Sequence, residues 1–346
     1  MTQEYVELDH ERNVSLTAYL LETGGAFRNV TKRPAVIVIP GGAYMYCSDR
    51  EADPVASVYL AKGYDVFILR YGVGQYRTWP GPLHDYEKAY EYIQSHAEEW
   101  HIMMNKIAVA GFSAGGHLAG AAATLSKYKP QAAILGYAAL NEQIKELLDG
   151  PDITKAVSYD TPPCFLFASR ADSVVRIENT IDMIQALTQF GVTYECHIYP
   201  YGPHGFSTGD RSILLNAGTF CPRARNWVDD STSFLEDIFG AFEADGDNGD
   251  ILAKPVCGGH MNDDSAAFFS IDCTVRKVFE NPAARNAISD EIEVMRKEVV
   301  PFTPEMTLEN MVHALPYMKL RDFLHERGIS IDEDLLNAKL ARVPNI

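Results

Sequence analysis

The sequence is poor in basic residues and has no long uninterrupted hydrophobic run. Its 346 residues include 30 Lys and Arg against 47 Asp and Glu, a formal net charge of −17. A chain this acidic repels the phosphate backbone of nucleic acids and the surface of anionic membranes. No apolar stretch approaches the ~20 residues that a membrane-spanning helix requires. We therefore expect neither a nucleic-acid partner nor a membrane partner.

Cysteine is also scarce, and its spacing does not indicate a disulfide framework. The six cysteines form no C-x-x-C pair and stand at positions 47, 164, 196, 221, 257 and 273. Cys164 and Cys196 lie inside apolar runs, which is typical of buried thiols in a reducing compartment. Residues 1–9 have neither the basic nor the apolar region of a secretory signal. The expected location is the cytoplasm.

What the sequence does contain is a regular alternation of β-rich and helical patterns between about residues 14 and 240. Continuous apolar runs such as Ala35–Ile39 are typical of strands buried on both faces of a parallel sheet. The helical patterns carry apolar residues three and four apart, as from Leu83 to Trp100. This alternation predicts an α/β fold with a mostly parallel, doubly wound sheet flanked by helices. The predicted strands are Val14–Leu21, Ala35–Ile39, Asp65–Arg70, Lys106–Ala110, Ala132–Tyr137, Cys164–Ser169 and Tyr194–Tyr199.

The pattern changes after about residue 244, where a run rich in Gly and Asp indicates a linker. Beyond it the strand signals stop. Asn281-Pro282 is a typical helix start, and Ser330-Ile331-Asp332-Glu333 fits a capping box. The C-terminal part has three open roles: covering the rim of a site, forming a homodimer, or capping an apolar face. The predicted organisation is an α/β domain at 1–245, a linker at 246–254 and a small helical C-terminal domain at 255–346.

The most informative segment is residues 106–120, where a short apolar strand leads into Gly-x-Ser-x-Gly and an alanine-rich helical run. Gly111 and Gly115 remove the side chains that would clash in a very tight strand-to-helix turn, and this turn exposes the hydroxyl of Ser113. The helix that begins at Ala114 points free N–H groups and its positive dipole end at developing negative charge. The segment predicts that Ser113 is a nucleophile, and a purely structural Gly/Ser turn is the alternative.

A nucleophilic serine needs a base and a carboxylate that orients the base, and in this architecture they follow in the order Asp, His. Asp172 comes just after the sixth predicted strand and His204 just after the seventh. The carboxyl ends of such strands are where these sheets place their sites. Asp160 precedes its strand and His197 lies within one, so both are less suitable. We expect Asp172 to fix the tautomer of His204, which then takes the proton of Ser113.

The third requirement is an oxyanion hole, for which the segment Pro40-Gly41-Gly42-Ala43-Tyr44 is the candidate. It follows a buried predicted strand, where this architecture places its second donor loop. Paired glycines let backbone N–H groups approach a substrate oxygen closely. We expect donation from the backbone of Ala114 and of Gly42 or Ala43. An ordinary Pro-Gly-Gly turn is the alternative.

Five aromatic residues near these motifs are candidates to bind substrate, because aromatic faces suit a sugar ring or an acyl chain. They are Tyr44, Tyr46, Trp79, Phe112 and Phe206. Core packing is the alternative for each of them, and the favoured one for Phe112. The connection at 140–161 is long and irregular, which indicates either a binding loop or lid or an ordinary surface insertion. No metal site is expected, and the chemistry requires no cofactor.

Together these residues resemble the α/β-hydrolase esterases, and most of all the bacterial branch that includes acetyl-xylan and other carbohydrate esterases. The resemblance covers about residues 14–240. It implies an α/β-hydrolase fold and an intracellular serine esterase that removes short acyl groups, often acetyl, from sugars or small alcohols. Ala43 stands where a third glycine is common, and Arg176 where a proline is common. The matching segments are 40–44, 79–85, 111–118, Asp172-x-x-Val175 and Gly202-Pro203-His204-Gly205-Phe206.

The predicted function is therefore a serine carboxylesterase that hydrolyses short-chain esters, acetyl esters above all, through an acyl-enzyme. Its partner is a small-molecule ester, with acylated sugars among the candidates. A small-peptide hydrolase or an arylformamidase is the alternative, because such enzymes share the fold and the three residues. A non-catalytic binding or scaffold protein is a further alternative.

Overall fold

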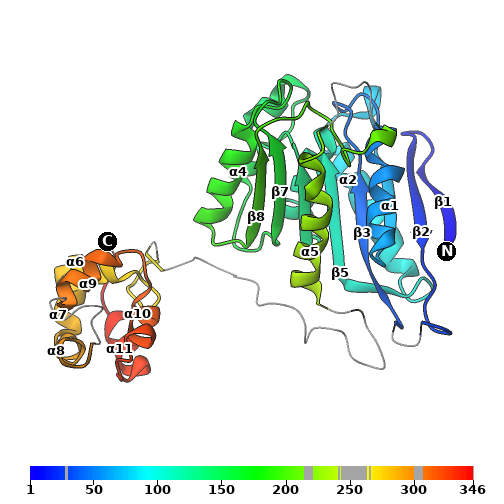
Figure 1. Ribbon diagram of the computed structural model, residues 1–346. Helices are drawn as coiled ribbons and strands as arrows, with labels where there is room; N and C mark the ends of the chain where they lie inside the picture. The colour runs from blue at the N-terminus through cyan, green and yellow to red at the C-terminus, as the bar shows by residue number, and fades with distance from the viewer. Residues whose placement is uncertain are drawn as a thin grey trace. The chain divides into compact units, whose positions relative to one another are not determined.

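The computed structural model of this chain consists of two compact units, Met1–Gly259 and His260–Ile346 (Figure 1). It describes residues 1–27, 30–213, 221–240, 242, 263–264, 266–299 and 307–345. The predicted linker at 246–254 lies outside the described residues. Each unit has a hydrophobic core of its own.

The N-terminal unit is built on one eight-stranded sheet with the strand order β1-β2-β4-β3-β5-β6-β7-β8. β1 and β2 pair antiparallel with each other, β2 pairs antiparallel with β4, and all the remaining pairs are parallel. The seven predicted strands are present, and the mostly parallel sheet confirms the predicted fold. The strands are β1 (Thr2–Asp9), β2 (Val14–Leu20), β3 (Arg33–Ile39), β4 (Asp65–Arg70), β5 (Ile102–Phe112), β6 (Ala132–Gly136), β7 (Cys164–Ser169) and β8 (Tyr194–Tyr199).

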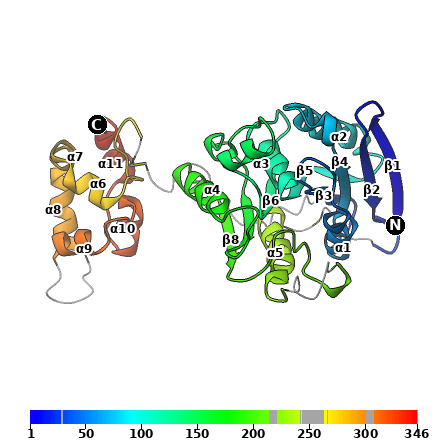
Figure 2. The ribbon, with the colours of Figure 1, turned by 90° about the horizontal axis from the view of Figure 1, so that it is seen from above.

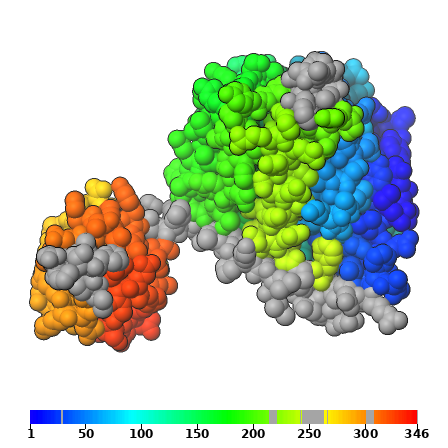
Figure 3. Space-filling view, in the orientation of Figure 1, coloured from blue at the N-terminus to red at the C-terminus, as the bar shows by residue number. Residues whose placement is uncertain are grey.

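Helices cover both faces of this sheet (Figure 2). On one face, α2 (Gly81–His96), α3 (Ala114–Thr124) and α4 (Glu178–Gln189) pack their apolar residues against the sheet. On the other face, α1 (Asp53–Ala61) and α5 (Trp227–Phe239) do the same. The space-filling view shows α5, in yellow-green, across the outside of that second face (Figure 3). The central strands are therefore buried on both sides, which explains their continuous apolar sequences.

The C-terminal unit is helical, as predicted, and its core includes Phe323 and Leu336. The side chain of Asn281 caps α7 by accepting a hydrogen bond from the N–H of Ala284. The predicted capping role of Ser330 is wrong, because α11 begins only at Glu333 and the side chain of Asp332 caps it. The helices are α6 (Val275–Glu280), α7 (Pro282–Ala287), α8 (Ser289–Glu298), α9 (Leu308–Ala314), α10 (Leu320–Glu326) and α11 (Glu333–Leu340).

Over the described part of both units, none of the helices has the length and apolar character needed to cross a lipid bilayer.

Candidate active site

Ser113 lies on a sharp turn between β5, which ends at Phe112, and α3, which begins at Ala114. Its backbone has φ 55° and ψ −119°, a conformation that L-residues adopt only under strain. Glycine is required on both sides of it. A Cβ atom at Gly111 would lie 2.2 Å from the carbonyl oxygen of Gly115, and one at Gly115 would lie 2.2 Å from that of Ile39. The tight turn expected from the motif is thus present, and it carries the serine at the carboxyl end of the sheet.

Ser113, His204 and Asp172 form one continuous hydrogen-bonded chain. The Oγ atom of Ser113 lies 2.8 Å from Nε2 of His204, and Nδ1 of His204 lies 2.7 Å from Oδ2 of Asp172. The other carboxylate oxygen of Asp172 accepts hydrogen bonds from the N–H groups of Val174 and Val175. The Asp172 side chain is buried, whereas that of His204 is 18% exposed. The carboxylate is therefore fixed in place, and the imidazole remains accessible beside the serine.

The two rejected candidates lie elsewhere. Asp160 is exposed, and Lys129 donates a hydrogen bond to its carboxylate. His197 is in β8, where its ring lies beside Glu195 and Asp230.

The glycine loop after β3 supplies backbone N–H groups next to the serine. Gly42, Ala43 and Tyr44 have positive φ angles of 128°, 55° and 57°. A Cβ atom at Gly42 would lie 2.0 Å from the carbonyl oxygen of Tyr46, so only glycine fits there. Within the described ranges, the N–H groups of Gly42, Ala43 and Ala114 make no hydrogen bond to the protein. These are the three donors that the sequence assigns to the oxyanion hole.

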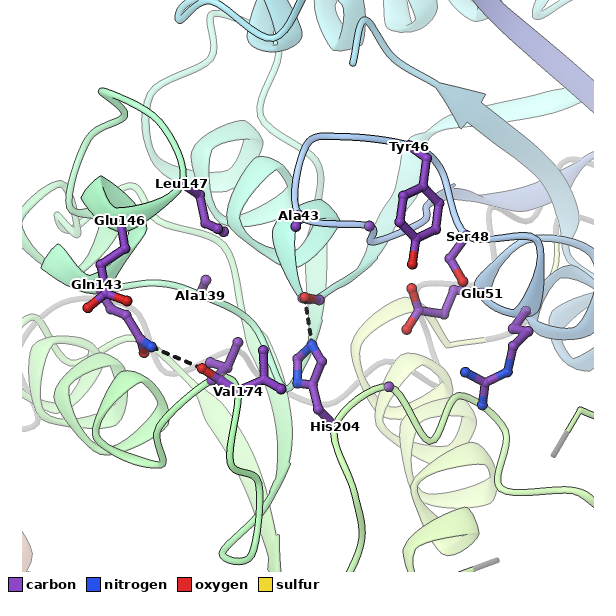
Figure 4. A pocket seen from close by; sticks show the side chains of 15 residues that line it. Ala43, Tyr46, Ser48, Glu51, Ala139, Gln143, Glu146, Leu147, Val174 and His204 are labelled. Atoms are coloured by element: carbon purple, nitrogen blue, oxygen red, sulfur yellow. Dashed lines mark hydrogen bonds between the residues drawn. The ribbon is translucent and has the colours of Figure 1, made fainter. Parts of the chain in front are cut away.

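A cavity of about 420 Å³ opens over Ser113 and His204. Figure 4 shows its two sides. One side is polar. The other side is more apolar and has the amide of Gln143 and the carboxylate of Glu146 at its edge. The polar side consists of Tyr46, Ser48, Arg50 and Glu51, and the other side of Ala139, Gln143, Glu146, Leu147, Val174 and Val175. In the described part of the chain, no group of three His, Cys, Asp or Glu side chains is arranged to hold a metal ion.

Of the five aromatic candidates for substrate binding, only Tyr46 lines this cavity, and this residue is 61% exposed. The assignment of the other four is corrected. Phe112 and Phe206 are buried in the core on the α1 and α5 face of the sheet. Tyr44 is buried in the opposite core, and Trp79 packs against that core. The rings of Tyr44, Phe112 and Phe206 contact other protein side chains instead of solvent, and Trp79, which is half-buried, does not line the cavity.

Tyr44 instead contacts His117, one helical turn after the serine. The Tyr44 hydroxyl lies 2.7 Å from Nδ1 of this histidine, and Nε2 lies 2.9 Å from the carbonyl oxygen of Pro151. His117 is fully buried, and burial lowers its pKa to about 4. The neutral imidazole thus connects the glycine loop with the connection at 140–161.

That connection is a wall of the cavity. Its 3-10 helix Glu142–Glu146 carries Gln143, and Gln143, Glu146 and Leu147 line the cavity. The long irregular connection was the signal for a binding loop in the sequence. The sequence analysis missed two features of the cavity: which residues of this connection line it, and the presence of Glu51 on the opposite side. No local sequence pattern indicates either feature.

The strand order, the turn at Ser113 and the site at the carboxyl ends of β5, β7 and β8 define the α/β-hydrolase class. The family model described as BD-FAE matches residues 27–152. A solved structure named MGS-M1, an α/β-hydrolase enzyme from a Medee basin deep-sea metagenome library, is 36% identical to this chain. The match covers 68% of this chain and 97% of that one, with a TM-score of 0.65. The chain belongs to the α/β-hydrolase family.

Two curated relatives are similar to part of this chain. An acetylxylan esterase of Xylanibacter ruminicola is 30% identical over 199 residues, which are 51% of this chain and 41% of that protein. Endo-1,4-β-xylanase B of Butyrivibrio fibrisolvens is 27% identical over 211 residues, which are 52% of this chain and 33% of that protein. This chain thus spans well under two thirds of the length of either relative.

Proposed function

We propose that this protein is a serine carboxylesterase that hydrolyses short-chain acyl esters, acetyl esters above all. The observation that carries this proposal is the hydrogen-bonded chain Ser113–His204–Asp172 at the floor of an open cavity. Beside it lie backbone N–H groups that make no hydrogen bond to any of the described residues. A serine hydroxyl is a weak nucleophile until a positioned base takes its proton. Each of the three groups lies within hydrogen-bond distance of the next one in the chain.

In the proposed reaction, Ser113 Oγ attacks the ester carbonyl carbon while His204 takes the hydroxyl proton at Nε2. Asp172 holds the other ring nitrogen and stabilises the imidazolium. The oxygen of the tetrahedral intermediate accepts hydrogen bonds from the N–H groups of Gly42, Ala43 and Ala114. The alcohol leaves with the proton from His204, and an acyl group remains on Ser113. Water, deprotonated by the same histidine, then releases the acid.

The two sides of the cavity suit the two parts of an ester substrate, its acyl group and its sugar. The apolar surface of Ala139, Leu147 and Val174 suits a short acyl group, and the hydroxyls of Tyr46 and Ser48 suit the hydroxyl groups of a sugar. The exposed ring of Tyr46 adds a flat apolar face on which a sugar ring can stack. The acetylxylan esterase among the relatives is consistent with an acetylated sugar as substrate.

The test is hydrolysis of p-nitrophenyl esters from acetyl to octanoyl by the wild type and by Ser113→Ala. The exposed Ser57 in α1 offers a matched control, Ser57→Ala. We expect activity that is highest with acetyl, falls about 10⁴-fold or more in Ser113→Ala, and is unchanged in Ser57→Ala. Full activity in Ser113→Ala would exclude the proposal. Turnover of formanilides or short peptides with no ester turnover would replace it with amide hydrolysis.

A further inference from the structure

Glu51 is a buried carboxylate at the active site that the Ser–His–Asp chain does not use. It ends the short helix Asp49–Glu51 and lines the cavity on its polar side, yet only 4% of the residue is exposed. Burying an ionised carboxylate costs free energy unless it is paired and hydrogen-bonded. Its contacts therefore indicate what it does.

The two oxygens of Glu51 contact the two loops that form the site. Oε2 accepts a hydrogen bond of 2.8 Å from the N–H of Gly41, at the start of the glycine loop. Oε1 accepts one of 2.7 Å from the hydroxyl of Tyr137, just after β6. The Tyr137 ring packs edge-on against the His204 ring, with centroids 5.2 Å apart, and its hydroxyl also accepts a hydrogen bond from the N–H of Ser207. One carboxylate thus joins the oxyanion loop to the histidine loop.

The fit around Glu51 is close. A Cβ atom at Gly41 would lie 2.7 Å from Oε2 of Glu51 and 2.9 Å from Cβ of Ser113. Glu51 accepts the hydrogen bond of the Gly41 N–H, and the next two N–H groups of the loop make no hydrogen bond within the described residues. The carboxylate therefore holds the start of the loop in place beside the serine.

The hydrogen-bond directions around Glu51 are those of an ionised group. The N–H of Ser207 already donates to the Tyr137 oxygen, so the phenol hydrogen points at Glu51, and both carboxylate oxygens accept. The pKa of Glu51 is raised overall, because burial outweighs the hydrogen bonds from Tyr137 and Gly41 and the charges of His204 and Arg50, which act in the opposite direction. The charged groups that face His204 are thus Asp172 on the β7 side, and Glu51 with its neighbour Arg50 on the other.

We propose that Glu51 is a positioning residue for the reaction at Ser113: it fixes the spacing of the oxyanion and histidine loops and places a second negative charge beside His204 when the imidazole is protonated. This inference rests on the proposed function, because it assumes that Ser113 is the nucleophile. A carboxylate at this place makes the imidazolium more favourable, so the pH range in which His204 acts as a base lies higher than it would without Glu51.

The experiment measures the rate at which a fluorophosphonate probe labels Ser113, from pH 5 to pH 9. This reaction needs the serine, the base and the oxyanion donors but no particular ester. The variants are Glu51→Gln, which removes the charge at nearly constant shape, and Glu51→Asp, which restores it. Glu87→Gln is the matched control. Like Glu51, Glu87 accepts one hydrogen bond from a hydroxyl, that of Ser126, and one from a backbone N–H, that of Lys127. Glu87 lies outside the cavity.

We expect Glu51→Gln to label about tenfold more slowly, with the acid limb of its rate–pH profile moved down by about one pH unit. Glu51→Asp returns the limb toward the wild-type position, and Glu87→Gln matches the wild type throughout. If Glu51→Gln folds and the acid limb of its rate–pH profile stays at the wild-type position, the inference is overturned and the proposed function remains intact. A wild type that is not labelled at Ser113 overturns the proposed function itself.

If Glu51→Gln does not fold, Tyr137→Phe carries the test. This variant keeps the aromatic ring against His204 and removes the hydroxyl that joins the carboxylate to the histidine loop. We expect labelling about tenfold slower than in the wild type. An unchanged rate would overturn the positioning role.

Discussion

The hydroxyl of Tyr44 lies 2.7 Å from Nδ1 of His117, and both side chains are completely buried. The Nε2 atom of the imidazole faces the carbonyl oxygen of Pro151, so its hydrogen is on Nε2, and Nδ1 accepts from the tyrosine. The pair holds the last residue of the glycine loop against the helix that follows the serine. The geometry of the oxyanion donors thus depends on a contact outside the cavity.

The first prediction concerns this pair. Tyr44→Phe leaves the buried Nδ1 acceptor without a partner, so the free energy of unfolding should fall by about 1–3 kcal/mol. Urea denaturation at pH 7.5 measures it. Tyr128→Phe is the control, because the Tyr128 hydroxyl bonds to Glu91 at the surface and its loss should cost less than about 0.5 kcal/mol. Equal losses in the two variants would contradict the structural role of the pair.

A second prediction concerns acid stability. Burial lowers the pKa of His117 to about 4 in the folded chain, from an ordinary value of 6.5. Between these values the unfolded chain binds a proton that the folded chain does not, so this residue destabilises the fold as pH falls, by about 1.4 kcal/mol per unit. In His117→Gln that dependence is absent. The stability difference between wild type and variant should therefore shrink from pH 6.5 to pH 4, and a constant difference would refute the assignment.

Asp65, at the start of β4, produces the opposite pH dependence. One carboxylate oxygen accepts a hydrogen bond from the N–H of Leu21, and the other has no partner among the described residues. Burial raises the pKa of Asp65 to about 7 from an ordinary value of 3.8. Its protonated form stabilises the fold below about pH 4, and this contribution is lost as pH rises through 7.

The third prediction follows from this sign. Asp65→Asn keeps the acceptor for Leu21 and cannot ionise, so it should be more stable than the wild type at pH 8, with the advantage shrinking toward pH 4.5. Urea denaturation at both values tests it. Asp149→Asn, at an exposed aspartate, should show no such trend. A wild type that is equally or more stable than Asp65→Asn at pH 8 would show that Asp65 ionises without cost.

The strands and the three residues of the hydrogen-bonded chain could be predicted because each leaves a local pattern. A buried parallel strand is continuously apolar, and a serine at a tight turn needs glycine on both sides. β1 was missed because it is an edge strand with mostly exposed, polar residues, which gives no such run. The continuous apolar sequence that marks the buried central strands is therefore not expected in a strand at the edge of the sheet.

The walls of the cavity could not be predicted, because they depend on how distant segments meet. Phe112 is next to the serine in sequence, but its ring lies in the core behind the sheet. Tyr44 follows two residues with positive φ that turn the chain, and it enters the opposite core. Glu51 has one partner ten residues away and another 86 residues away. Only the folded chain brings these groups together.

Gln143 provides the last prediction, because its side chain joins one wall of the cavity to the loop that carries Asp172. Its Nε2 atom donates to the carbonyl oxygen of Val174, and its Oε1 atom accepts from the N–H of Arg176 and from Nδ2 of Asn179.

Gln143→Ala removes all three of these hydrogen bonds, so the wall and the aspartate loop should lose their fixed spacing, and kcat/KM for an acetyl ester should fall about tenfold. Gln185→Ala, at an exposed glutamine in α4, is the matched control and should retain wild-type kinetics. Because Asp172 is also held by the N–H groups of Val174 and Val175, the loss should appear more in KM than in kcat. A fall in kcat alone would mean that Gln143 acts through the aspartate, and unchanged kinetics would mean that the aspartate loop holds the wall without it.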